Sequence, residues 1–166
     1  MVVPPKSFYL LVLLSLAVPA QAAPQIVAAR GQWAALSEGR TCEAASRSLR
    51  QPAKGRMPAR ASLSYDAGGP RHGQFSVLLS RSPRPGASVM LTIGQTPFLL
   101  MPQGDRAWSR GPAQEAAIIA ALRSNQSMKV EARSPGGGRI RDYYSLDGAP
   151  LAIDAAAACA ARLANR

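Results

Sequence analysis

The sequence predicts a mainly β domain, an antiparallel sandwich or barrel that carries two short helices. Short apolar stretches recur at roughly ten-residue spacing, and turns rich in Pro and Gly separate them. Helical periodicity is confined to two stretches, and one of them is C-terminal. The 144 residues that follow residue 22 suit one domain of ordinary size, which we expect over residues 31–166.

Residues 1–22 have the features of a cleavable signal peptide. Lys6 supplies a positive charge, Phe8–Val18 is an apolar run, and Ala20–Ala22 matches the small-x-small cleavage pattern. The run is shorter than the about 20 residues that a spanning helix needs, so an uncleaved membrane anchor is the weaker alternative. We expect a periplasmic or secreted protein, with residues 23–30 as a flexible leader and no transmembrane segment after cleavage.

The first part of the domain predicts a hairpin and a third strand. Gln32–Leu36 is short and apolar, Ser37–Arg40 has the composition of a turn, and Thr41–Ser46 is expected to return as the partner strand. Ala61–Tyr65 is the next strand expected. Trp33 lies in the first strand, where a core anchor is favoured over a carbohydrate platform.

The clearest strands lie in the middle of the chain. Gln74–Ser80 and Ser88–Ile93 alternate apolar and polar residues at the period of a half-buried strand. Pro97–Met101 and Arg106–Ser109 are expected to follow as two more strands, and Trp108 is expected in the core like Trp33. The residues expected to face the core in the two clearest strands are Phe75, Val77, Leu79, Val89, Leu91 and Ile93.

A helix is predicted to begin at Pro112 and to end near Asn125. Proline fits the first helical turn because the missing N–H has no partner there. The apolar stripe of this helix consists of Ile118, Ile119 and Leu122.

The last part predicts a hairpin and a C-terminal helix. Ser127–Arg133 alternates as a strand, Pro135–Gly138 is a turn, and Arg139–Leu146 is the partner strand. Tyr143 and Tyr144 should then point to opposite faces of the sheet. Leu151–Leu163 is rich in Ala and predicts the second helix, and Met128, Val130 and Ala132 are expected to face inward.

Two cysteines, Cys42 and Cys159, stand 117 positions apart in the chain. In an exported protein a lone pair is expected to form a structural disulfide. The alternative is a redox pair, but such pairs are usually close in sequence, as in the CxxC motif.

The chain is strongly basic, with 20 Lys and Arg against nine Asp and Glu and a net charge of +11. This charge favours an anionic partner such as lipid head groups, lipopolysaccharide or acidic glycans; nucleic acid fits poorly with export. The positive charge is most concentrated in residues 47–60, which contain no acid. The candidate binding residues for an anionic partner are Arg47, Arg50, Lys54, Arg56 and Arg60. The alternatives are a solvated loop and a composition that reflects the base content of the genome.

No catalytic residue, metal ligand set or cofactor motif is predicted. His72 is the single histidine, and its surroundings lack a GxSxG-type nucleophile motif. One histidine and a bridged cysteine pair leave zinc without ligands, and no DxDxDG loop is present. A cryptic hydrolase that uses His72 or a carboxylate pair remains an alternative.

After an early Trp33, several segments follow one another in order over some 120 residues, from Gly39 to a terminal Cys159. They are Arg40-Thr41-Cys42-Glu43-Ala44, Pro85–Gly94, Pro97-Phe98, Ala107-Trp108, Ile119–Arg123, Met128–Glu131 and Asp142–Gly148. In this order the segments resemble the invasion-associated locus B family of secreted or periplasmic bacterial proteins. The resemblance implies an immunoglobulin-like β-sandwich, an envelope location and, in pathogens, a link to host-cell entry; it implies no catalytic residue.

The sequence therefore favours a non-enzymatic exported envelope protein that binds a partner through its surface. The partner is a protein or an anionic component of the envelope or of a host surface. A periplasmic inhibitor or chaperone-like module, which presents a strand edge or loop to another protein, is the alternative.

Overall fold

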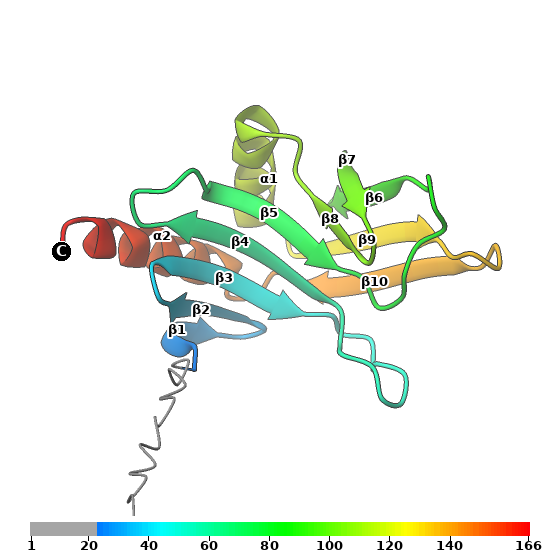
Figure 1. Ribbon diagram of the computed structural model, residues 1–166, viewed down its shortest axis with the longest axis horizontal. Helices are drawn as coiled ribbons and strands as arrows, with labels where there is room; N and C mark the ends of the chain where they lie inside the picture. Colours follow the sequence, from blue (N-terminus) through cyan, green and yellow to red (C-terminus); the bar gives the residue numbers. More distant parts are fainter. Residues whose placement is uncertain (1–22) are drawn as a thin grey trace, which may run out of the picture.

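Within residues 23–166, which the computed structural model describes, ten antiparallel strands form one curved sheet and two helices pack against it (Figure 1). The strand order is β1-β2-β3-β4-β5-β8-β7-β6-β9-β10. The predicted mainly β class with two helices, one of them C-terminal, is confirmed. The bounds are β1 Gln25–Arg30, β2 Trp33–Glu38, β3 Thr41–Arg47, β4 Arg60–Asp66, β5 His72–Leu78, β6 Val89–Ile93, β7 Thr96–Gln103, β8 Arg106–Trp108, α1 Pro112–Ser124, β9 Ser127–Arg133, β10 Arg139–Ser145 and α2 Ala149–Ala164.

The sheet turns a corner at β7. The first part of β7, residues 96–100, pairs with β6, whereas its last part, residues 101–103, pairs with β8. The sheet thereby folds into two layers, with β1 to β5 and β8 in one and β6, β9 and β10 in the other. Strands that pass from one layer to the other make the corners of β-sandwiches, so the fold is sandwich-like.

Alternate residues of both layers fill the core. Trp33 is 1% exposed, and on β10 Tyr144 is 1% exposed while its neighbour Tyr143 is 45% exposed, as opposite faces require. Fully burying one large apolar side chain stabilises the fold by about 1.5–3 kcal/mol. The buried set includes every inward residue that the alternation predicted, namely Phe75, Val77, Leu79, Val89, Leu91, Ile93, Met128, Val130 and Ala132.

The helices cover the inner face of the first layer. α2 lies across β1, β2, β3 and β4, and α1 packs against β5 (Figure 1). Ile118 and Leu122 of α1 are buried, whereas Ile119 is half-buried. The buried face of α2 consists mostly of small residues, which let the helix backbone approach the strands closely. These residues are Ala149, Ala152, Ile153, Ala156, Cys159 and Ala160.

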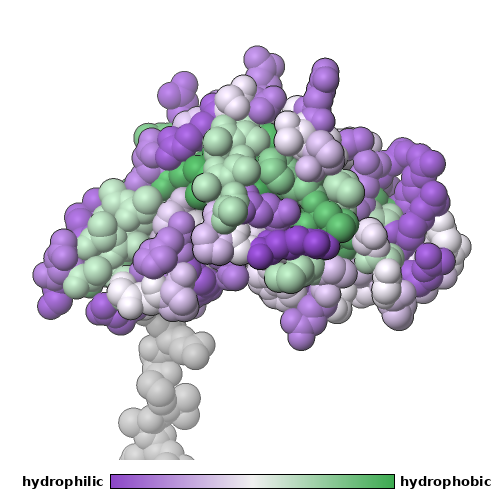
Figure 2. Space-filling view, turned by 90° about the horizontal axis from the view of Figure 1, so that it is seen from above, coloured by the Kyte–Doolittle hydropathy of each residue, from purple (hydrophilic) through white to green (hydrophobic). Residues whose placement is uncertain are grey.

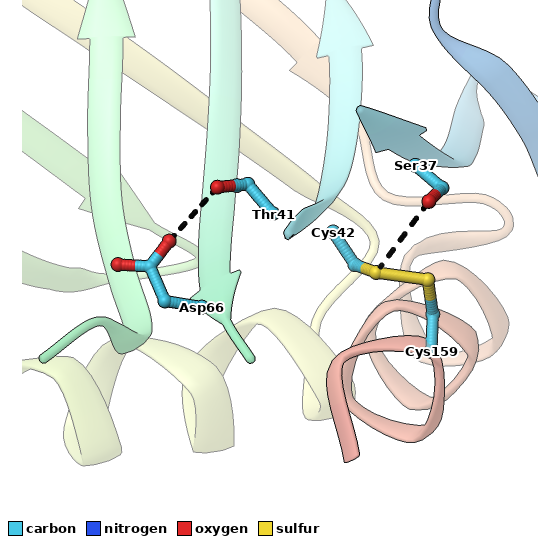
Figure 3. The surroundings of a disulfide bond; sticks show 5 residues. All are labelled: Ser37, Thr41, Cys42, Asp66 and Cys159. Carbon is cyan, nitrogen blue, oxygen red and sulfur yellow. Dashed lines mark hydrogen bonds between the residues drawn. A yellow bond between two sulfur atoms is a disulfide. The ribbon is translucent and has the colours of Figure 1, made fainter. Parts of the chain in front are cut away.

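A disulfide between Cys42 and Cys159 joins β3 to α2, as predicted (Figure 3). The two Cα atoms are 6.0 Å apart, and both side chains are buried. The Ser37 hydroxyl on the neighbouring strand β2 lies 4.0 Å from the Cys42 sulfur. The bond closes nearly the whole described domain into one covalent loop.

Hydrogen bonds also tie the start of the domain to its last strand. The indole Nε1 of Trp33 donates to the carbonyl of Ser145 at 2.9 Å, and the backbone N–H of Gln32 donates to the carbonyl of Asp147 at 3.1 Å. The N–H of Leu49, just after β3, donates to the carbonyl of Tyr143 at 2.8 Å. Strands β2 and β3, near one end of the strand order, and β10, at the other end, are therefore connected by hydrogen bonds.

One carboxylate is fully buried in the described part of the chain. Asp142 on β10 accepts a hydrogen bond from the backbone N–H of Ser80 at 3.0 Å. The bond fixes the connection that follows β5 against β10. Burial, followed by the nearby charge of Asp142, raises the pKa of Tyr144 above its ordinary value.

The structure corrects two predictions. Residues 23–30 are not a flexible leader, because Gln25–Arg30 forms β1 and pairs with β2. Trp108 is not a core anchor: Ala107 points inward from β8, so Trp108 lies half-buried on the outer face.

The predicted signal peptide, residues 1–22, lies outside the described residues. Neither described helix is both long enough and apolar enough to cross a membrane.

Replacing both cysteines, in a Cys42→Ala/Cys159→Ala variant, is expected to lower the free energy of unfolding by about 4–5 kcal/mol, because the reduced chain regains the entropy of a very long loop. Urea unfolding followed by circular dichroism measures the change. Ser37→Ala, which keeps the bond, is the control and should stay near wild type. Equal stability of the double variant and wild type would contradict the prediction. Free thiols in denatured, unreduced wild-type protein would contradict it as well.

Candidate functional site

The predicted basic residues lie in and beside the loop that connects β3 to β4 (Figure 1). Arg47 ends β3 and Arg60 begins β4, and the two residues face each other in the strand register. Arg50, Lys54 and Arg56 are exposed on the projecting part of the loop, which we call the loop tip. The structure thus brings two of the five residues together at the base and places three at the tip.

The base of this loop is held by hydrogen bonds. The N–H of Ser48 donates to the carbonyl of Ala59 at 2.8 Å, and the Ser48 hydroxyl donates to the carbonyl of Tyr143 at 3.2 Å. Within the tip, the N–H of Arg56 donates to the carbonyl of Ala53 at 2.9 Å, which closes a turn. An anchored base carries a solvent-facing charged tip.

The five basic residues differ in their partners. Arg60 forms an ion pair with Glu43, whereas the other four form none within residues 23–166. Hydrophilic side chains also project around the margin of the molecule, with apolar patches between them (Figure 2). What distinguishes the loop is the concentration of its charge, since residues 47–60 contain five basic residues and no acid.

Beside the loop base, the outer face of the first layer holds a depression of about 820 Å³, which we call the trough. Its floor is a row of small residues that are direct neighbours in the register of four strands. Small side chains on adjacent strands leave room that larger ones would fill. The floor consists of Ala34 on β2, Ala45 on β3, Ser62 on β4 and Ser76 on β5.

Two further register rows form the walls of the trough. One wall is mostly basic and continues from the base of the loop: Arg47, Arg60, Leu78 and Arg106, on β3, β4, β5 and β8. The opposite wall is mixed: Leu36, Glu43 and Ser64, on β2, β3 and β4. Met57 and Pro58 of the basic loop also line the trough.

The Arg60–Glu43 ion pair crosses the floor. Glu43 is the register neighbour of Ser64, four positions along β4 from Arg60, so the two side chains meet over Ser62 and Ala45. The Arg60 side chain is 41% exposed and that of Glu43 is 23% exposed. Ion pairs at such exposure contribute about 0–1 kcal/mol, so little energy holds this bridge in place.

A second ion pair lies at the far end of the trough. Arg71 donates two hydrogen bonds to Asp66, at 2.6 and 2.8 Å, and a third to the Thr41 hydroxyl at 3.2 Å. The hydrogen bonds that Arg71 and, to a lesser extent, the Thr41 hydroxyl donate to Asp66 hold the pKa of its carboxyl below the usual value of 3.8. The two charges neutralise each other, which leaves Arg47 and Arg106 as the trough arginines without an ion pair in the described chain.

The residues proposed for other chemistry lie apart from the trough. His72 is exposed at the first position of β5, where it faces Tyr65 in the register, and it does not line the trough. No group of three or more His, Cys, Asp or Glu side chains that could hold a metal ion occurs among residues 23–166.

Sequence reasoning found the loop but missed the trough. Arg71, Arg106, Glu43 and the floor residues were not identified as candidates. One signal was present: in Arg60–Asp66 serines alternate with apolar residues, so the solvent-facing positions of β4 are small.

Comparison with known proteins supports the fold and leaves the activity open. No protein-family model matches the chain, and no curated protein sequence matches it. The crystal structure of invasion associated protein B from Bartonella henselae is similar, with a TM-score of 0.53 and 18% sequence identity, over 82% of this chain and 97% of the other. At this identity the likeness concerns the fold alone, so the predicted family resemblance is supported as a distant likeness in fold.

Asp66→Asn is expected to lower the free energy of unfolding at neutral pH by about 1 kcal/mol, because the charged hydrogen bonds with Arg71 are lost. The loss is no larger because Arg71 is partly exposed and solvent screens the pair. The lowered pKa means that the Asp66 contribution is complete above pH 3.8 and is lost as the pH falls through the folded-state pKa. Urea unfolding from pH 7 to pH 2 should therefore show the two proteins converge in acid.

Asp105→Asn is the control for this series, since Asp105 is exposed and has no ion pair among the described residues. The control should follow wild type at each pH. A constant difference between Asp66→Asn and wild type down to pH 2 would contradict the assignment.

Proposed function

We propose that this chain is a non-enzymatic exported protein that binds an anionic partner through its basic loop. The observation that carries the proposal is a loop whose base is hydrogen-bonded and whose tip presents Arg50, Lys54 and Arg56 without ion pairs in the described chain. Arginine binds phosphate, sulfate and carboxylate groups through paired N–H donors, which suits lipid head groups and acidic glycans.

Two observations support export to the periplasm or beyond. Residues 1–22 have the composition of a cleavable signal, and the Cys42–Cys159 disulfide suits an oxidising compartment. The structure of similar fold is that of an invasion associated protein. A role of this chain at the envelope or at a host surface is compatible with that likeness and is part of the proposal.

A second candidate is an inhibitor or chaperone-like module that binds a protein by strand addition. β1 lies at one end of the sheet order, and its Ile26 is 72% exposed. A partner strand could pair with this edge through backbone hydrogen bonds. Such binding would persist at high salt, whereas binding through the loop would weaken with screening.

The loop proposal predicts a charge-dependent affinity for anionic surfaces. The variant Arg50→Gln/Lys54→Gln/Arg56→Gln should bind phosphatidylglycerol vesicles about 100-fold more weakly than wild type at low salt, because each basic residue near such a surface contributes about 1 kcal/mol. Vesicle co-sedimentation measures the affinity, and dextran sulfate beads provide a parallel test for a glycan-like polyanion.

The matched control is Arg110→Gln/Arg162→Gln/Arg166→Gln, which removes the same charge from three exposed positions outside the loop. It should lose much less affinity. Equal losses in both variants would show that net charge alone governs binding, and unchanged binding by the loop variant would remove the loop from the proposal.

A further inference from the structure

The trough has the dimensions and lining of a binding site that is separate from the loop tip. It runs across β2, β3, β4, β5 and β8, and neighbouring strands are about 4.8 Å apart, so it spans about 19 Å. An extended peptide of about six residues has this length. The strands of the floor are paired on both sides, so a ligand here is recognised by side chains and not by strand addition.

Charge favours an acidic ligand. Four arginines and two glutamates line the trough, and Arg71 is already neutralised by Asp66. Arg47 and Arg106 stand at opposite ends of the basic wall, three strand spacings or about 14 Å apart. Two carboxylates four residues apart on an extended chain match this separation.

Apolar positions favour a peptide over other anions. Leu36, Leu78 and Met57 line the trough, and Leu78 lies between Arg60 and Arg106 in the basic wall. Trp108, the register neighbour of Ser76, stands beside the end of the floor, but none of the described residues that line the trough is aromatic, unlike the stacking platforms that bind sugars and bases. A membrane surface is too broad to follow the floor of a depression.

We propose that the trough binds an extended acidic segment of a partner protein, with its carboxylates held by Arg47 and Arg106. In the free protein the Arg60–Glu43 ion pair lies across the floor where the segment would lie. A carboxylate of the segment replaces Glu43 as the partner of Arg60. Glu43 is therefore an internal competitor, and its removal strengthens binding.

The experiment begins with a random hexapeptide display library panned on the chain from residue 23 onward. Enriched peptides should carry two acidic residues four positions apart with an apolar residue between them. The absence of enrichment, or enrichment of peptides without acidic residues, overturns the proposal.

Calorimetry with the most enriched peptide then tests the residues. Arg47→Gln and Arg106→Gln should each weaken binding about fivefold, which corresponds to about 1 kcal/mol for one exposed charge contact. Glu43→Gln should strengthen binding by up to about fivefold, a change that damage to the fold would not produce. Arg110→Gln, outside the trough, should match wild type; weaker binding by Glu43→Gln overturns the competitor role.

Two further measurements separate this inference from the proposed function. The loop-tip variant Arg50→Gln/Lys54→Gln/Arg56→Gln should retain peptide binding, whereas Arg106→Gln should retain vesicle binding. Loss of peptide binding in the loop-tip variant places the peptide on the loop and overturns the trough assignment. Displacement of the peptide by equimolar dextran sulfate overturns the choice of a peptide over a sulfated glycan.

Discussion

The covalent link between β3 and α2 is the constraint on which the rest of the structure depends. Cys42 points inward from β3, while Thr41 beside it points to the opposite face (Figure 3). The alternation of a strand places Glu43 on the same outer face as Thr41. The bond holds the C-terminal helix against the inner side of the very strand whose outer side forms the trough. Because β3 is bonded to α2 on its inner side, it keeps its register with β2 and β4. The rows of side chains on its outer side therefore stay aligned.

Hydrogen bonds complete what the disulfide begins. Trp33 and Gln32 reach the carbonyls of Ser145 and Asp147, just before α2. The helix is therefore fixed at its start by these contacts and near its end by Cys159. The first hairpin, the last strand and the last helix therefore restrain one another. Detaching one of them from the sheet breaks its contacts with the other two.

The sequence was most informative where one face of an element is buried. Alternation in Gln74–Ser80 and Ser88–Ile93 follows from burial on one side, and both segments are strands with the expected faces inward. β1 was missed because it is largely exposed on both faces, so no burial pattern marks it and its pairing with β2 supplies the order. Trp108 was misplaced because a three-residue strand offers no alternation from which to infer its face.

The candidate site divides in the same way. The basic loop is a continuous run of residues, so its charge is visible in the sequence. The floor of the trough is assembled from four strands, and Ala34, Ala45, Ser62 and Ser76 become neighbours only through the register. No single one of these small residues is unusual, and a one-residue slip would send each of them to the core. At 18% identity the likeness to the Bartonella protein concerns the fold and carries no argument about these charges.

The contact between the basic loop and β10 has a consequence for self-association. An unpaired strand at the end of a sheet is a template on which other chains can assemble into fibres. Leu49 and Trp33 donate hydrogen bonds to backbone carbonyls of β10. At the other end of the strand order, the register shift between Ile26 and Ala28 makes the edge strand β1 irregular. Leu49, which lies in the basic loop, thus also covers part of the β10 edge, where another chain would otherwise find free carbonyls.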